Sequence, residues 1–202
     1  MHIAVLGTGH MATTLGTGLQ QAGHTIVFGS RSPGEHQDLS ADVTDHAAAV
    51  QGADVVLSAL AAASSLEALT ALRGPLAGHI LIDIGNAVDE RLQLLYPVTS
   101  LGERLQAALP GTRVVKALST LPGTVAVDPA SLSGPTSLFL AGDDAQAKAL
   151  VSSLIGDLGW PQDACIDLGD ITAALAMERY FSLSAALMAT FRGAPFNIAV
   201  IR

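Results

Sequence analysis

Short apolar runs alternate with helix-like segments over the first 168 residues of the chain. The apolar runs are typical of strands that are covered on both faces, as strands of parallel sheets are. They span residues 3–6, 24–28, 53–60, 78–86, 112–118, 137–141 and 164–168. Segments with helical character lie between them, around Leu15 and Leu19 and over residues 44–51, 64–72, 100–109 and 144–158. This order predicts an α/β fold with a doubly wound parallel sheet and right-handed crossovers.

The pattern changes after residue 169. Residues 171–191 read as one long helix with apolar residues on more than one face. A helix of this kind is expected to be buried, either over the sheet or against a second copy of the chain. The tail over residues 196–202 is too apolar for a loose end. We therefore expect a sheet domain over residues 1–168, followed by a small C-terminal helix and tail over residues 169–202.

The turns that follow the predicted strands are expected to meet in one cleft. Ligands of doubly wound sheets bind beyond the carboxyl ends of the strands, near the point where the strand order reverses. The polar stretch over residues 32–42, with Pro33 and Gly34, fits a loop at the mouth of that cleft. The converging turns are those after Leu6, Phe28, Leu60, Ile84 and Lys116.

A glycine-rich turn follows the first strand, with the sequence Gly7-Thr8-Gly9-His10-Met11-Ala12. A helix that begins there presents free backbone N–H groups and partial positive charge to a pyrophosphate. Gly7 permits the tight turn, Gly9 lets phosphates approach the backbone, and Ala12 lets the helix pack closely on the strand. Because a strand precedes the turn and a helix follows it, the sequence favours a Rossmann-like dinucleotide site over a turn that binds nothing.

The residues after the second strand indicate NADP rather than NAD. Enzymes that use NAD carry a carboxylate here, which accepts hydrogen bonds from the ribose hydroxyls and would repel a 2′-phosphate. This chain instead has Gly29, Ser30 and Arg31, with no acidic residue among them. Arginine presents a planar fork that matches phosphate oxygens, and serine adds a hydroxyl donor. The alternative is that Arg31 is a solvated loop residue.

Composition limits the classes of partner. The chain has 202 residues, of which 50% are hydrophobic and 14% charged, so an ample core is expected. No apolar stretch reaches the roughly 18 residues that a membrane-spanning helix needs. The net charge of −8 disfavours nucleic acid and anionic membranes as partners, since both attract basic surfaces. Arg31 would be a local exception.

Cysteine and histidine usage points to no metal and no disulfide. Cys165 is the only cysteine, and it lies in a segment that reads as a buried strand. The six histidines fall in different segments without the spacing of metal ligands. The first core strand begins at residue 3, where a basic and apolar leader would otherwise stand. We therefore expect a cytoplasmic protein without a metal site.

Two further segments make the sequence more distinctive: Val115-Lys116-Ala117-Leu118-Ser119-Thr120 and the tail from Phe196 to Arg202. Together with the Gly7 turn and the Ser30-Arg31 pair, they resemble the NADPH-dependent reductases of the deazaflavin coenzyme F-420. The resemblance covers almost the whole chain. The opening segment alone is also similar to pyrroline-5-carboxylate reductases and to the cytoplasmic domains of six-transmembrane metalloreductases.

The resemblance implies a compact dinucleotide domain, usually dimeric, that passes a hydride between NADPH and a flat acceptor. It places Thr8, Ser30 and Arg31 beside the 2′-phosphate, and His10 and Met11 beside the pyrophosphate. It places the segment Ala59-Leu60-Ala61 along the cofactor, and Asn86 and Ala117 at the nicotinamide. The C-terminal helix and tail would then contribute to the acceptor site and to a homodimer contact.

Two positions depart from the family pattern. Relatives often carry a lysine shortly after the Ser-Arg pair, where this chain has Glu35 and His36. The affinity for NADP is then expected to be lower, or to depend on the charge of His36. The usual Lys-Ala-Phe-Asn is Lys116-Ala117-Leu118-Ser119 here, which removes an aromatic ring and an amide near the acceptor.

The chemistry requires few protein groups. Hydride transfer between a nicotinamide and a flavin-like ring needs two stacked rings and the exclusion of water, without an obligatory acid or base. No catalytic pair is evident in the sequence. Lys116 could polarise a carbonyl of the substrate or complete a structural hydrogen-bond network. Ser119 and Thr120 could contact the acceptor or cap a turn.

Three functions remain open from the sequence. The first is an NADPH-dependent oxidoreductase that acts on a deazaflavin or flavin-like acceptor, with a flavin or metal reductase as a variant. The second is a redox sensor that binds NADP(H) without turnover. The two differ in whether a pocket for a second ring exists opposite the nicotinamide. The third, an imine reductase, is disfavoured because those enzymes complete their site with a longer helical dimer domain.

Overall fold

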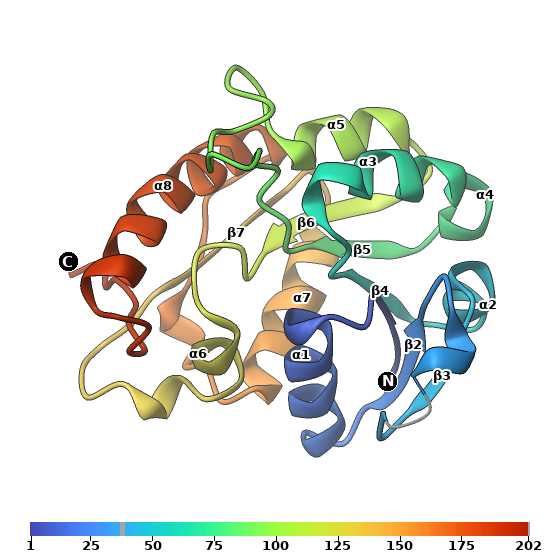
Figure 1. Ribbon diagram of the computed structural model, residues 1–202, viewed down its shortest axis with the longest axis horizontal. Coiled ribbons are helices and arrows are strands. Elements are labelled where there is room, and N and C mark those ends of the chain that lie inside the picture. Colours follow the sequence, from blue (N-terminus) through green and yellow to red (C-terminus); the bar gives the residue numbers. More distant parts are fainter. Residues whose placement is uncertain (37–38, 202) are drawn as a thin grey trace.

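The computed structural model describes residues 1–36 and 39–201 and contains a single sheet (Figure 1). The strand order is β3-β2-β1-β4-β5-β6-β7-β8. The strands are β1 (His2–Leu6), β2 (Thr25–Gly29), β3 (Asp42–Thr44), β4 (Val55–Ser58), β5 (Ile80–Asp83), β6 (Arg113–Ala117), β7 (Leu138–Gly142) and β8 (Cys165–Asp167). The order reverses between β1 and β4, which is the switch point of a doubly wound fold. The predicted Rossmann-like α/β class is confirmed.

Helices cover both faces of the sheet (Figure 1). One face packs against α1 (His10–Gln21), α6 (Gly123–Val127) and α7 (Ala145–Asp157), which bury residues such as Leu15, Val125 and Leu154. The other packs against α2 (His46–Val50), α3 (Ala62–Ala71), α4 (Arg73–Leu76) and α5 (Leu101–Ala108). Burial on both faces explains why the strands are apolar runs rather than alternating ones.

The last part of the sheet differs from the predicted parallel arrangement. Strand β7 runs antiparallel to β6, with Val115 opposite Gly142, and parallel to β8. The chain returns to β7 through α6 and the segment over residues 128–137 instead of through a single crossover helix. The hydrophobic pattern of a buried strand is the same in either direction, so it carried no signal for this reversal.

Several element boundaries also differ from the prediction. Thr44, expected to begin a helix, ends β3, and α2 begins at His46 because the side chain of Asp45 accepts a hydrogen bond from the backbone N–H of Ala48 at 2.9 Å. Neither β3 nor α6 was predicted. Cys165 begins β8 but is only half-buried, and burial raises the pKa of its thiol.

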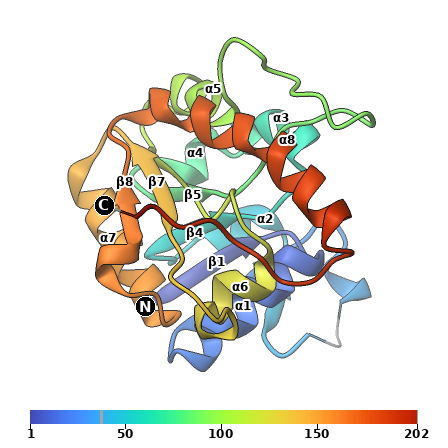
Figure 2. The same ribbon diagram turned by 90° about the vertical axis from the view of Figure 1, so that its left-hand side faces the viewer.

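The C-terminal helix crosses one end of the sheet (Figure 2). It consists of a 3₁₀ turn (Ile171–Ala173) followed by α8 (Ala174–Thr190). The tail then runs back along the segment before β7. Ser137 N–H donates to the carbonyl of Ile198 at 2.9 Å, and the Asn197 amide donates to Thr136 Oγ1 at 2.6 Å. The tail is thus attached to the fold, as its apolar sequence suggested, although Arg202 lies outside the described residues.

Candidate functional site

A cavity of about 1000 Å³ opens at the carboxyl ends of β1, β2, β4, β5 and β6. It extends from the loop after β2 to α8 and the turn that follows α8. The cavity therefore lies where the strand turns were expected to converge. Its lining includes Gly7, Thr8, Gly9, His10, Met11, Ser30, Arg31, Glu35, His36, His46, Ala59, Leu60, Ala61, Ile84, Gly85, Asn86, Leu118, Ser119, Phe181, Ser184, Met188 and Phe196.

The glycine turn is built as the sequence predicts. Gly7 has a φ of +114°, and a Cβ atom added to it would lie 2.7 Å from the carbonyl oxygen of Ala59. Its N–H donates to the carbonyl of Gly29 at 2.8 Å, which ties the turn to β2. Any larger residue would be both strained and in collision with the backbone. Gly7 thus holds β1, β2 and β4 close together beneath the cavity.

The N-terminus of α1 faces the cavity without a side-chain cap. Gly9 is the N-cap residue, its side-chain-free position provides no capping hydrogen bond to the first N–H groups, and the first turn contains no acidic residue. By contrast, Asp45, Ser100 and Asp144 cap α2, α5 and α7. A Cβ atom added to Gly9 would meet nothing within 4 Å. The free N–H groups and the open space before them fit a pyrophosphate.

Hydrogen-bonding side chains gather where β2 ends. Ser30 is 6% exposed, and its hydroxyl accepts a hydrogen bond from the N–H of Ser32 at 3.1 Å. Arg31 is exposed and lines the cavity. Across the loop, His36 Nε2 lies 3.0 Å from Thr8 Oγ1, so the loop after β2 touches the glycine turn. This places His36 beside Thr8, in the same cavity lining as Arg31.

His46 is a site residue that the sequence analysis did not select. It is the first residue of α2, it lines the cavity, and its Nδ1 atom is buried without a hydrogen-bond partner among the described residues. Burial and the neighbouring Arg31 lower the pKa of His46, against the opposing effects of Asp45 and Gly29. His46 reaches the site because β3, which precedes α2, pairs with β2. No local sequence motif indicates this placement.

The opposite end of the cavity contains uncharged groups. Leu118 has a φ of +58°, and this left-handed residue turns the chain at the end of β6. The Asn86 amide donates to the carbonyl of Ser119 at 2.7 Å and so joins the ends of β5 and β6. Asn86 Oδ1 and Ser119 Oγ are buried and have no partner among the described residues. Buried polar atoms of this kind are usually satisfied by water or a ligand.

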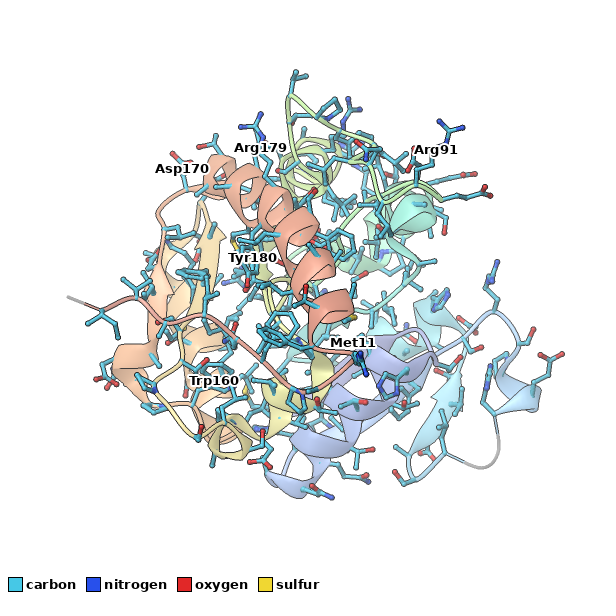
Figure 3. All side chains as sticks on the ribbon, turned by 60° about the vertical axis from the view of Figure 1, so that its left-hand side comes forward. Met11, Arg91, Trp160, Asp170, Arg179 and Tyr180 are labelled. Carbon is cyan, nitrogen blue, oxygen red and sulfur yellow. The ribbon has the colours of Figure 1, made fainter. Side chains whose placement is uncertain are left out.

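Helix α8 and the tail form the wall facing that end. Phe181, Ser184, Met188 and Phe196 line the cavity there. Met11, in the first turn of α1, also lines the cavity, and Figure 3 labels its position. None of the described residues that line this end, from the strand ends of β4 to β6 or from α8, has an ionisable side chain. The wall suits an uncharged planar group.

Lys116 and Ala117, predicted to contact the substrate and the nicotinamide, do not line the cavity. Both side chains are fully buried in β6. The Lys116 ammonium group donates to Asp83 at 2.9 Å, to Glu178 at 2.8 Å and to the carbonyl of Gly85. All three N–H groups of the ammonium therefore donate to partners within the protein. This agrees with the alternative in which Lys116 completes a structural hydrogen-bond network. Among the remaining predicted residues, Gly7, Thr8, Gly9, His10, Met11, Ser30, Arg31, Ala59, Leu60, Asn86 and Ser119 all line the cavity.

Two further features concern metals and membranes. Within residues 1–36 and 39–201, no group of three or more His, Cys, Asp and Glu side chains is arranged to hold a metal ion. None of the helices in that part of the chain has the length and apolar character needed to cross a membrane.

The fold and the cavity together define a dinucleotide-binding enzyme domain of the doubly wound class. The profile of the family described as NADP oxidoreductase coenzyme F420-dependent matches residues 2–87. A crystal structure from Arthrobacter sp. FB24, of a protein assigned as an F420-dependent NADP-reductase, is 36% identical and has a TM-score of 0.93. The match covers 99% of both chains. The chain thus belongs to this family and is an NADP-dependent oxidoreductase.

The curated relatives that match this chain are longer proteins. Metalloreductase STEAP3 from Rattus norvegicus is 31% identical over 180 residues, which are 87% of this chain and 35% of that protein. The chain spans 35% to 38% of the length of the curated relatives it matches. A reductive aminase from Aspergillus terreus in complex with NADPH shares the fold, with a TM-score of 0.70 and 18% identity. The match covers 95% of this chain and 62% of the aminase.

Proposed function

We propose that the protein transfers a hydride between NADP(H) and a deazaflavin or flavin-like acceptor. The observation that carries this proposal is one continuous cavity, which has the Arg31 cation and hydrogen-bonding side chains at one end and an uncharged wall at the other. The first end suits a nucleotide phosphate, and the second suits stacked rings from which water is excluded. Family membership supports the nucleotide, and the name of the Arthrobacter relative supports a deazaflavin acceptor.

The nucleotide would be held from one end of the cavity to the other. Ser30, Arg31 and Thr8 would bind the 2′-phosphate, and the N–H groups from Gly9 to Met11 would bind the pyrophosphate. The backbone of Ala59 and Leu60 would pass along its middle, and Asn86 and Ser119 would border the nicotinamide. When bound, NADPH supplies a hydride from C4 of its ring. The protein orients the rings and excludes water with Phe181, Met188 and Phe196.

The room opposite Asn86 favours an enzyme over a sensor. Phe181, Ser184 and Phe196 line the same cavity as Gly85 and Asn86, so a second ring has a place to bind. A sensor that only binds NADP(H) needs no such pocket. The match to a metalloreductase supports a second candidate, in which a reduced flavin passes its electrons to a metal ion that is the substrate.

Turnover with different acceptors tests the proposal. Purified protein would receive NADPH with the deazaflavin coenzyme, free flavins, simple quinones or a flavin plus a ferric chelate, and oxidation would be followed at the nicotinamide absorbance. We expect turnover with the deazaflavin or a flavin. Reduction of the ferric chelate that depends on added flavin would favour the metal-reductase candidate. Tight binding of NADPH without turnover by any acceptor would favour the sensor and contradict the proposal.

We also propose that the protein is a cytoplasmic homodimer that pairs through α8 and the tail. Leu183, Phe191 and Ile201 are 54%, 49% and 78% exposed. Large apolar side chains that are exposed along one segment of chain commonly mark a contact between chains. Light scattering after size exclusion would give the mass of a dimer, and Leu183→Glu should lower it toward that of the monomer.

A further inference from the structure

A buried charge cluster lies directly behind the uncharged end of the cavity. It joins Lys116 on β6, Asp83 on β5 and Glu178 on α8, whose side chains are at most 1% exposed. Lys116 Nζ lies 2.9 Å from Asp83 and 2.8 Å from Glu178. Because α8 also supplies the cavity wall, the cluster connects that wall to the centre of the sheet.

Both carboxylates are surrounded by hydrogen-bond donors. Asp83 accepts from the N–H of Gly85 at 3.0 Å. Glu178 accepts from the N–H groups of Leu101 and Gly102 at 3.1 and 3.3 Å, in the first turn of α5. Each carboxylate thus accepts hydrogen bonds from Lys116 and from the backbone. Burial alone would lower the pKa of Lys116, but Asp83 and Glu178 outweigh it and raise this pKa. Lys116 is therefore held as an ammonium ion.

The cluster carries one unbalanced negative charge, since two carboxylates face one ammonium group. The partial positive charge at the N-terminus of α5 offsets only part of it, being worth about half a charge. Glu103 adds a further negative charge to the same helix turn, where it accepts bonds from the N–H and hydroxyl of Ser100. Arg104 and Arg179, the neighbouring cations on α5 and α8, have exposed side chains that solvent screens. The buried groups of the cluster therefore leave a net negative charge on the cavity side.

Little separates this charge from the cavity. Gly85 lines the cavity, and a Cβ atom added to it would lie 3.2 Å from Asp83 Oδ1. Its carbonyl also accepts a hydrogen bond from Lys116. The described lining residues at this end contribute no ionisable side chain that would oppose the field. In a buried, water-poor region such a field acts more strongly than at the surface.

Hydride donation changes the charge of the nicotinamide ring, which would lie at Gly85 and Asn86. The C4–H bond of NADPH breaks with both its electrons, the hydride joins the acceptor ring, and a proton from solvent completes the reduced acceptor. The neutral dihydropyridine ring becomes a pyridinium cation in this step. A negative field at the ring favours the cation.

We propose that the buried Lys116–Asp83–Glu178 cluster stabilises the oxidised, cationic nicotinamide relative to the reduced one, and so favours hydride donation from NADPH. This inference rests on the proposed function, because it needs the nicotinamide at Gly85 and Asn86. Asp83 and Glu178 act through space and touch neither ring. The direction of transfer is thus biased by residues outside the cavity lining.

Binding of the two redox forms tests this without turnover. The dissociation constants of NADP⁺ and NADPH would be measured by calorimetry and fluorescence for the wild-type chain, Glu178→Gln and Asp83→Asn. Loss of one negative charge should raise the ratio of the NADP⁺ constant to the NADPH constant about fivefold. For a two-electron couple, a fivefold rise in this ratio makes oxidation of the bound NADPH less favourable by about 20 mV.

Two controls separate this effect from others. Glu67→Gln removes the same charge from the exposed side of α3 and should leave the ratio unchanged. The nucleotide fragment without the nicotinamide, 2′-phospho-ADP-ribose, should bind the cluster variants as it binds the wild type. Equal weakening of NADP⁺ and NADPH by both substitutions would show a merely structural cluster and overturn the inference. If the wild-type chain binds neither nucleotide, the proposed function itself is wrong.

Discussion

The two ends of the cavity are built in different ways. The nucleotide end comes from one stretch of chain, residues 7–46, and its lining includes Arg31, His36 and His46. The opposite end assembles segments from β5, β6, α8 and the tail, and the described residues that line it are uncharged. Its charges lie behind the wall, in the Lys116 cluster. Under the proposed function, one end would recognise a ligand by charge, while the other would hold rings and act on them through the field of buried charges.

The largest effect is expected from breaking the cluster behind the uncharged end. Lys116→Met would leave Asp83 and Glu178 buried, close together and without a counter-ion. We expect the free energy of unfolding to fall by about 3–5 kcal/mol, measured by urea denaturation. Lys148→Met is the matched control, because Lys148 pairs with the half-exposed Asp167 at 2.9 Å and should cost less than about 1 kcal/mol. Similar losses in the two variants would contradict a buried charged cluster.

Removing the main cation of the nucleotide end should come next. Arg31→Ala is expected to weaken NADPH binding roughly 30-fold, because a charge-assisted bond to phosphate is lost. The affinity for NADH, which lacks the 2′-phosphate, should change little. Arg113→Ala serves as the control, because Arg113 begins β6 and so lies at the end of the strands opposite the cavity. Equal losses for both nucleotides would refute a 2′-phosphate site at Arg31.

A substitution in α8 tests the other end. Phe181→Ala should raise the KM for a flavin-like acceptor about tenfold, since an aromatic stacking surface is removed. The dissociation constant of NADPH should stay the same. Ser182→Ala, on the exposed side of the same helix and outside the cavity lining, should leave both values unchanged. An effect of Phe181→Ala on NADPH alone would place the acceptor elsewhere.

The smallest effect concerns pH at the nucleotide end. Burial and Arg31 lower the pKa of His46, so the free protein holds it neutral near pH 7.5. A bound phosphate dianion raises this pKa, and binding then takes up a proton. The affinity for NADPH relative to NADH should therefore rise about threefold as the pH falls from 7.5 to 6.5.

His46→Asn should flatten most of that dependence. The charged or titratable groups around His46 are Arg31, Asp45, Glu35 and His36. His36→Asn therefore needs to be measured beside it to separate the two imidazoles. A pH profile that neither substitution changes would show that histidines do not assist Arg31.

The nucleotide end could be predicted from sequence because its signals are local. Gly7, Gly9, Ser30 and Arg31 stand at fixed distances after two apolar runs, and backbone geometry dictates their types. The alternation of elements likewise predicted the sheet and its cavity edge. His46 escaped notice because β3 is only three residues long and resembles a loop.

The opposite end could not be predicted to the same depth. Lys116 stands in an apolar strand, and its partners Asp83 and Glu178 lie far from it in the sequence, so only the fold brings them together. Glu178 is an isolated acidic residue in a largely apolar helix, which indicates a buried partner. The local sequence does not identify Lys116 as that partner. The direction of β7 carried no signal either, since burial on both faces looks the same in both orientations.

A crystal structure with NADP⁺ bound would test the central claim most directly. We expect the 2′-phosphate within hydrogen-bond distance of Arg31 and Ser30, the pyrophosphate at the N–H groups that follow Gly9, and the nicotinamide at Gly85 and Asn86. Space for a second ring should remain against Phe181. A nucleotide bound in the reverse direction, or outside this cavity, would contradict the division of the cavity into a nucleotide end and an acceptor end.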